Sequence, residues 1–165
     1  MSSAGLHRDA LSKAVGAERF GTDFSPPGCL WAGAKRAGVP HARIKAVHTG
    51  EARAVDGVTA VLTGADVPGS NLQGIVHKDQ PVLATDTVRH AGDAVALVVA
   101  GSREALAEAL ALIRLDLEPL PGVFDPELAL APGAPLVHAG REGGNLLARG
   151  LVHKGDAREA MRSCD

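Results

Sequence analysis

Aromatic residues and blocks of basic charge are both scarce in this chain of 165 residues. Three Phe and one Trp are present with no Tyr, too few to form the platforms on which proteins stack single-stranded nucleic acid. The net charge is −2 and no run of Lys and Arg exceeds two residues, so the positive surface of a nucleic-acid-binding protein is missing. The composition therefore predicts that nucleic acid is not a partner.

Cysteines and long apolar runs are also few. Cys29 and Cys164 lie far apart and form no C-x-x-C pair, which argues against a zinc knuckle or a disulfide framework. No run approaches the roughly 18 apolar residues of a membrane helix, and the first residues lack the apolar stretch of a signal peptide. We expect a soluble cytoplasmic protein with reduced thiols and no membrane partner.

The polar residues show no established catalytic or metal-binding spacing. None of the histidines sits in H-E-x-x-H or four residues from another, and no G-x-S-x-G motif supports a nucleophilic triad. The sequence therefore assigns no catalytic, cofactor-binding or metal-binding residue. The seven histidines are His7, His41, His48, His77, His90, His138 and His153.

Apolar periodicity predicts several strands and two helices. Strands are expected over residues 29–37, 42–49, 58–64, 94–100 and 114–122. In the second of these, alternation places Ile44, Ala46 and His48 on one face. A short helix is expected over residues 49–57, with Thr49 as N-cap and Gly57 as its stop.

The stretch from Val88 to Ile113 carries the clearest local signals. "AVALVVA" is typical of a strand covered on both faces, and Ser102 is a good N-cap for a helix that buries Leu106 and Leu110. The strand that follows predicts a right-handed crossover, if the two strands lie parallel in one sheet. These patterns predict an α+β domain with a mixed sheet and two or three covering helices.

A strand, a Gly-Ser turn and a helix can also bind phosphate. A dinucleotide site needs G-x-G-x-x-G, whereas the turn "AGSREA" holds one glycine. A scaffold role is favoured, and weak nucleotide or anion binding at Gly101 and Ser102 is the alternative.

Two irregular segments complete the prediction. The entry segment "AVGAERFGTDF" is expected to pack Phe20 and Phe24 on the domain body. Residues 69–80 form a long loop, a kind of segment that is often functional. Within and just beyond this loop, "HKDQP" (residues 77–81) is the best place for a polar contact with a ligand or partner subunit, with a solvated loop as the alternative.

The order of six segments resembles the N-terminal α/β-hammerhead domain of the molybdenum-binding subunit of the xanthine dehydrogenase and aldehyde oxidase family, the molybdenum hydroxylases. Residues 37, 38, 94 and 117 depart from the family pattern, all at scaffold positions. The segments that carry the resemblance are "VGAERFGTDF", "GCLWAGAKRAGVPHARI", "DGVTAVLTGADVPG", "DQPVLATDTVRHAGDAVALVVAGSREALAEALALI", "LEPLPGVFDPELAL" and "GNLLARGLVHKGDAREAM".

The resemblance implies a domain layout and a role. It implies a flexible N-terminus at 1–13, the hammerhead at 14–140 and an exit segment at 141–165. The whole enzyme would hydroxylate an aldehyde or N-heterocycle with oxygen from water. It would use a molybdopterin cofactor and [2Fe-2S] clusters, often with FAD, while this chain alone would be inactive.

The implied partners are the molybdopterin-binding domains and the iron-sulfur domain or subunit of the same enzyme. Self-association into a homo-oligomer stays open. A different class of function is a free-standing interaction or assembly module that binds a partner through the loop at residues 69–80.

Overall fold

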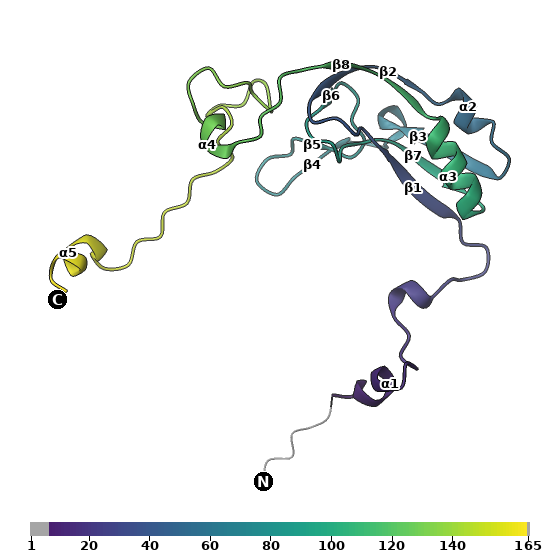
Figure 1. Cartoon of the computed structure of the whole chain (residues 1–165), viewed down its shortest axis with the longest axis horizontal. Coiled ribbons are helices and arrows are strands. Elements are labelled where there is room, and N and C mark those ends of the chain that lie inside the picture. The colour runs from purple at the N-terminus through teal and green to yellow at the C-terminus, as the bar shows by residue number, and fades with distance from the viewer. Residues whose placement is uncertain (1–6, 165) are drawn as a thin grey trace, which may run out of the picture.

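Two small antiparallel sheets form the body of the protein (Figure 1), in a computed structural model that describes residues 7–164. One sheet has the order β1-β7-β3, with bounds Trp31–Arg36, Ala94–Ala100 and Val58–Thr63. The other has the order β6-β2-β8, with bounds Thr87–Val88, Ala42–His48 and Arg114–Pro119. A two-stranded ribbon joins β4 (Leu72–Gln73) to β5 (Gln80–Pro81).

Two helices cover the β1-β7-β3 sheet: α2 (Gly50–Arg53) and α3 (Arg103–Leu112). Helix α3 lies close over Gly33 of β1, where a Cβ atom would be 3.1 Å from the side chain of Leu110. The remaining helices are α1 (Ala10–Ala14), η1 (Gly21–Asp23), η2 (Gly64–Asp66), α4 (Pro126–Ala129) and α5 (Ala157–Arg162). In Figure 1, α1 and α5 lie away from the sheets, toward the two ends of the chain.

The central strand β7 supplies both halves of the core. Because side chains alternate along a strand, Ala96 and Val98 point to one cluster and Val95 to the other. The first cluster includes Ala109 and Ile113 from the α3 side, and the second lies over β2 and β6. The continuous apolar run of β7 therefore reflects burial on both faces, as its sequence predicts.

Most predicted elements are confirmed, including the α+β class, the strands and the Ser102 N-cap. Ser102 Oγ accepts a hydrogen bond of 3.1 Å from the backbone N–H of Ala105. Thr49 stands at the N-cap position of α2, but its side chain makes no cap hydrogen bond. The helix is shorter than the expected 49–57 and ends at Arg53, with Ala54 as its C-cap. Gly57 is therefore not its stop, and its φ of +80° belongs to the turn that leads into β3, a conformation that costs glycine little.

The right-handed crossover does not form, because its condition of two parallel strands in one sheet is not met. Strands β7 and β8 flank α3 in the chain but pair with different neighbours, β7 with β1 and β3, and β8 with β2. All of these pairings are antiparallel. Periodicity predicts a strand but not its partner, because pairing is decided by contacts distant in sequence.

Two local expectations also fail. Phe20 and Phe24 are more than half exposed, so the entry segment does not pack them on the body. In β2 the register shifts between Ile44 and Ala46, and His48 is exposed while Val47 packs against the first core cluster. A bulge changes which face a side chain occupies, which simple alternation cannot foresee.

Replacement of Ile113 by Ala is a direct test of this core. Ile113 is 2% exposed, so Ile113→Ala should lower the free energy of unfolding by about 2 to 5 kcal/mol. Ile75 is fully exposed at the β4–β5 hairpin, so Ile75→Ala should change it by less than about 0.5 kcal/mol. Urea denaturation followed by circular dichroism measures both, and equal effects would contradict the assigned core.

Candidate functional site

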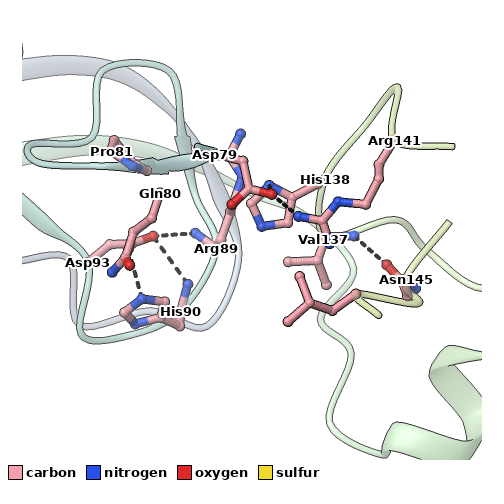
Figure 2. A pocket seen from close by; sticks show the side chains of 11 residues that line it. Asp79, Gln80, Pro81, Arg89, His90, Asp93, Val137, His138, Arg141 and Asn145 are labelled. Carbon is pink, nitrogen blue, oxygen red and sulfur yellow. Dashed lines mark hydrogen bonds and ion pairs between the residues drawn. The ribbon is translucent and has the colours of Figure 1, made fainter. Parts of the chain in front are cut away.

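A cavity of about 430 Å³ opens beside the β5 end of the β4–β5 hairpin (Figure 2). One wall is the hairpin itself, and a second is the β6–β7 turn, residues 89–93. The third is an exit loop, defined here as residues 129–147, which folds back toward the hairpin. Segments distant in sequence therefore form one cavity, whose lining is polar on one side and apolar on the other.

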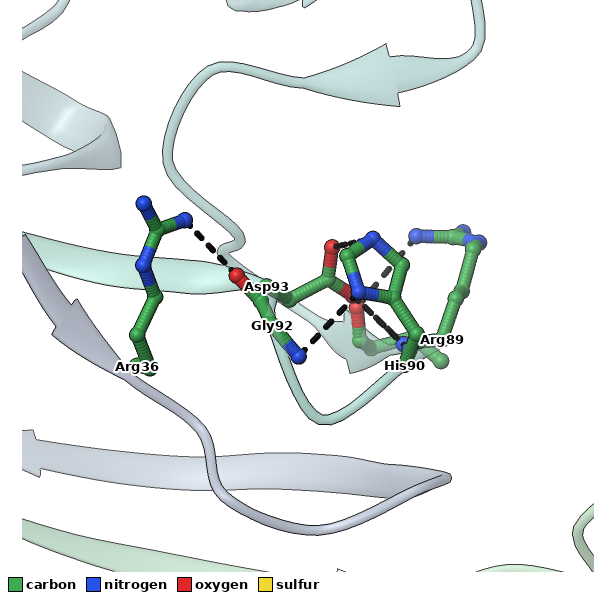
Figure 3. A network of polar contacts seen from close by, with 6 residues as sticks. Arg36, Arg89, His90, Gly92 and Asp93 are labelled. Carbon is green, nitrogen blue, oxygen red and sulfur yellow. Dashed lines mark hydrogen bonds and ion pairs between the residues drawn. The ribbon is translucent and has the colours of Figure 1, made fainter.

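The buried carboxylate of Asp93 organises the β6–β7 turn (Figure 3). Asp93 is 6% exposed, and its Oδ2 accepts hydrogen bonds from the backbone N–H groups of Arg89 (2.6 Å) and His90 (3.3 Å). Its backbone carbonyl accepts from the N–H of Ala37 at 2.9 Å. A carboxylate saturated by backbone donors can be buried at tolerable cost.

The turn also fixes the proton on the His90 imidazole. The backbone N–H of Gly92 donates to Nδ1 at 3.1 Å, so the proton of the neutral ring sits on Nε2. Nε2 lies 2.9 Å from Asp93 Oδ1. Arg36 closes the outside of the turn by donating to the Gly92 carbonyl at 2.7 Å.

Asp93→Asn should therefore destabilise the protein, because the amide NH₂ must face either the backbone N–H groups or the His90 Nε2–H. One buried donor then stays unsatisfied, at a cost of about 1 to 3 kcal/mol. Urea denaturation measures the difference. Asp56 is exposed, so Asp56→Asn is the matched control, and equal stability of the two variants would show that Asp93 does not anchor the turn.

Asn145 gives the exit loop its shape. Its Oδ1 accepts from the backbone N–H of Val137 at 2.9 Å, and its Nδ2 donates to the carbonyls of Ala129 (3.0 Å) and Pro135 (2.9 Å). The loop so formed turns Arg141 toward the hairpin, where its guanidinium pairs with Asp79. The exit loop and the hairpin are thus joined by an ion pair.

His138 lies beside this ion pair, with Nδ1 3.6 Å from Asp79 Oδ2. Burial lowers the pKa of His138, the charges of Arg89 and His77 lower it further, and Asp93 opposes the shift. The ring is therefore held neutral to a lower pH than an exposed histidine. It adds a polar but uncharged edge to the cavity at neutral pH.

Removal of the Arg89 charge should raise the pKa of His138 toward its ordinary value. NMR titration of the His138 ring resonance measures this in Arg89→Gln, with Arg89→Lys as the charge-conserving control. An unchanged pKa in Arg89→Gln would contradict the assigned electrostatics. Because the folded-state pKa of His138 is lowered, its contribution to stability should be lost as pH falls below about 6.5, where the unfolded chain takes up the proton first.

The structure places one of the two sequence-based candidate sites at the cavity and the other away from it. The "HKDQP" segment does border the cavity, through Asp79, Gln80 and Pro81, and its polar contact is made with the exit loop of the same chain. Gly101 and Ser102 do not border it. There the Ser102 hydroxyl serves as helix cap, which supports the scaffold interpretation.

The histidines do not assemble into a metal site. Within residues 7–164 no group of three or more His, Cys, Asp or Glu side chains could hold a metal ion. His41 Nδ1 lies 2.7 Å from the Pro121 carbonyl oxygen, and His48 Nε2 lies 2.8 Å from Asp116 Oδ2. These imidazoles hold neighbouring strands and loops together.

Sequence reasoning missed Arg89, Asp93, Arg141 and Asn145. An Asp after Gly at the start of an apolar run is a recognisable signal for Asp93, because Asp side chains bond nearby backbone N–H groups in turns. No local pattern indicates Arg89 or Arg141, since their roles depend on a loop that returns from far along the chain.

The fold and the cavity define a small α+β domain with two antiparallel sheets and covering helices. The α/β hammerhead domain model of aldehyde oxidase and xanthine dehydrogenase matches residues 15–121. The chain therefore belongs to this family of molybdenum hydroxylases, as its sequence motifs predict.

Similar proteins agree with the family assignment. The chain is 41% identical over 157 residues to the nicotinate dehydrogenase large molybdopterin subunit of Eubacterium barkeri, covering 95% of this chain and 36% of that protein. It is 42% identical over 157 residues to a subunit of a probable xanthine dehydrogenase of Bacillus subtilis, covering 95% of this chain and 21% of that protein. The chain thus spans little more than a third, or less, of the length of these relatives.

A solved structure shows the same fold. Quinoline 2-oxidoreductase from Pseudomonas putida 86 superposes with a TM-score of 0.76 and 32% sequence identity, over 87% of this chain and 19% of that one. The aldehyde oxidoreductase from Desulfovibrio gigas does so with a TM-score of 0.74 and 33% identity, over 81% and 16%.

Proposed function

We propose that this chain is the structural hammerhead domain of a molybdenum hydroxylase that oxidises an aldehyde or an N-heterocycle with oxygen from water. The observation that carries the proposal is the family match over residues 15–121. The redox chemistry belongs, in this proposal, to the larger part of the enzyme, because the chain corresponds to 36% and 21% of two relatives.

The described residues do not fit an iron-sulfur cluster, one of the cofactors that such an enzyme uses. The chain has two cysteines, whereas a [2Fe-2S] cluster is held by four ligands, usually thiolates. Cys29 and Cys164 are both exposed and free. We therefore assign the iron-sulfur clusters to other domains or subunits. We propose the same for molybdopterin and FAD, because the chain corresponds to only 36% and 21% of two relatives, and derive no reaction step from this chain.

Exposed apolar side chains near both ends of the described chain support a docked role. Phe20 and Phe24 precede the body, and Leu151 and Val152 follow it, all more than half exposed. Large apolar surface of this kind is stabilised when a partner covers it. We propose the molybdopterin-binding and iron-sulfur units as partners, with domain limits near residues 14 and 140 and a cytoplasmic location.

No helix within residues 7–164 is long and apolar enough to cross a membrane.

A second candidate is a free-standing assembly module that binds a partner through the β4–β5 hairpin. The observation that favours it is the exposure of Ile75 and Val76 at the hairpin, with Leu72 half exposed beside them. Aspartate substitutions at Ile75 and Val76 would abolish capture of such a partner.

The purified 165-residue chain should fold, carry no molybdenum and reduce no dye when an aldehyde or N-heterocycle is added. Circular dichroism, metal analysis and a dye-reduction assay measure these three properties. Stoichiometric molybdenum with substrate-dependent dye reduction would overturn the structural role. Capture of a hydroxylase subunit from a matched cell extract would support it, and capture of another protein through the hairpin would favour the second candidate.

A further inference from the structure

The cavity beside the hairpin contains one guanidinium that forms no salt bridge within the described residues. Arg141 pairs with Asp79, whereas Arg89 forms no salt bridge within residues 7–164. Arg89 Nη1 makes one long hydrogen bond, 3.3 Å, to the Thr87 carbonyl. Its Nε is shielded from solvent and has no acceptor among the described residues.

The carboxylates that border the same cavity are already engaged. Asp93 accepts from two backbone N–H groups and faces the His90 Nε2–H. Asp79 faces Arg141 and His138. Neither is free to turn toward Arg89 without breaking the turn or the ion pair that shapes the cavity. The guanidinium is thus held at the wall without a salt-bridge partner among the described residues.

The other side of the cavity is apolar. Pro81 comes from the hairpin, and Val137 and Leu147 come from the exit loop. Figure 2 shows the exit-loop side chains facing the hairpin across the space. The volume of about 430 Å³ lies in the range of pockets that bind small molecules.

We propose that this cavity binds a small organic carboxylate with a short apolar body. The carboxylate pairs with the outer edge of the Arg89 guanidinium, whose planar donors suit bidentate recognition of a carboxylate. The apolar body lies on Val137, Leu147 and Pro81. This site goes beyond the proposed structural role and would exist whether or not that role is correct.

The site makes a distinctive electrostatic prediction. An anion beside Arg89 offsets a positive charge that acts on His138. Binding should therefore raise the pKa of His138, whereas a neutral molecule in the same space should not. If Arg89 served only to hold the turn in shape, binding of a carboxylate would not change the pKa of His138.

The test uses the 165-residue chain with benzoate as the probe and benzamide as its neutral isostere. NMR should show saturable shifts of the Val137 and Leu147 methyl resonances with benzoate at about millimolar affinity, and a higher pKa of His138 in the saturated protein. Benzamide should bind at least about tenfold more weakly, because it lacks the charge-assisted pair.

Arg89→Gln should weaken benzoate binding by about tenfold or more, and Arg89→Lys by less, since lysine keeps the charge but loses the bidentate geometry. Arg53→Gln removes a charge from α2 and should leave binding unchanged. Equal binding of benzoate and benzamide, an equal loss in Arg53→Gln, or no saturable shift with benzoate would each overturn the proposal. Should Arg89→Gln not fold, the benzoate and benzamide titrations of the wild-type chain still decide.

Discussion

The buried carboxylate of Asp93 is the constraint on which the rest of the structure depends. Strand β6 belongs to one sheet and β7 to the other, and only the five residues from Arg89 to Asp93 separate them. Asp93 holds this reversal through two backbone N–H groups, and its own carbonyl accepts from Ala37 after β1. One residue thus links both sheets, and its turn forms a wall of the cavity.

The same arrangement explains why the domain needs few large side chains. Strand β7 presents Ala and Val to both sides, and Ala52 and Ala109 let α2 and α3 lie close to the sheet. These small buried residues allow close helix and sheet contacts, while many larger apolar side chains are exposed on the entry segment, the hairpin and the exit loop. These exposed side chains are the surface that the proposed docked role would cover.

The sequence is informative where the cause of structure is local. The alternation in "ARIKAVHT", the apolar run of β7 and the cap at Ser102 all arise within a few residues, and each predicts its element correctly. The packing of Phe20 and Phe24 and the face of His48 depend on more than the local pattern, and both are predicted wrongly. The crossover fails at its condition, because β7 and β8 lie in different sheets. The cavity residues Arg89 and Arg141 lie fifty-two positions apart, so no local pattern could join them.

Leu115 of β8 packs against both core clusters. Because Leu115 contacts both clusters, a loss of packing in one cluster also disturbs the other, and moving this side chain opens a void in both. The two sheets are separate in hydrogen bonding, yet they form one cooperative unit in packing. Slow amide exchange in β2 and in β7 would then report the same global opening of the domain.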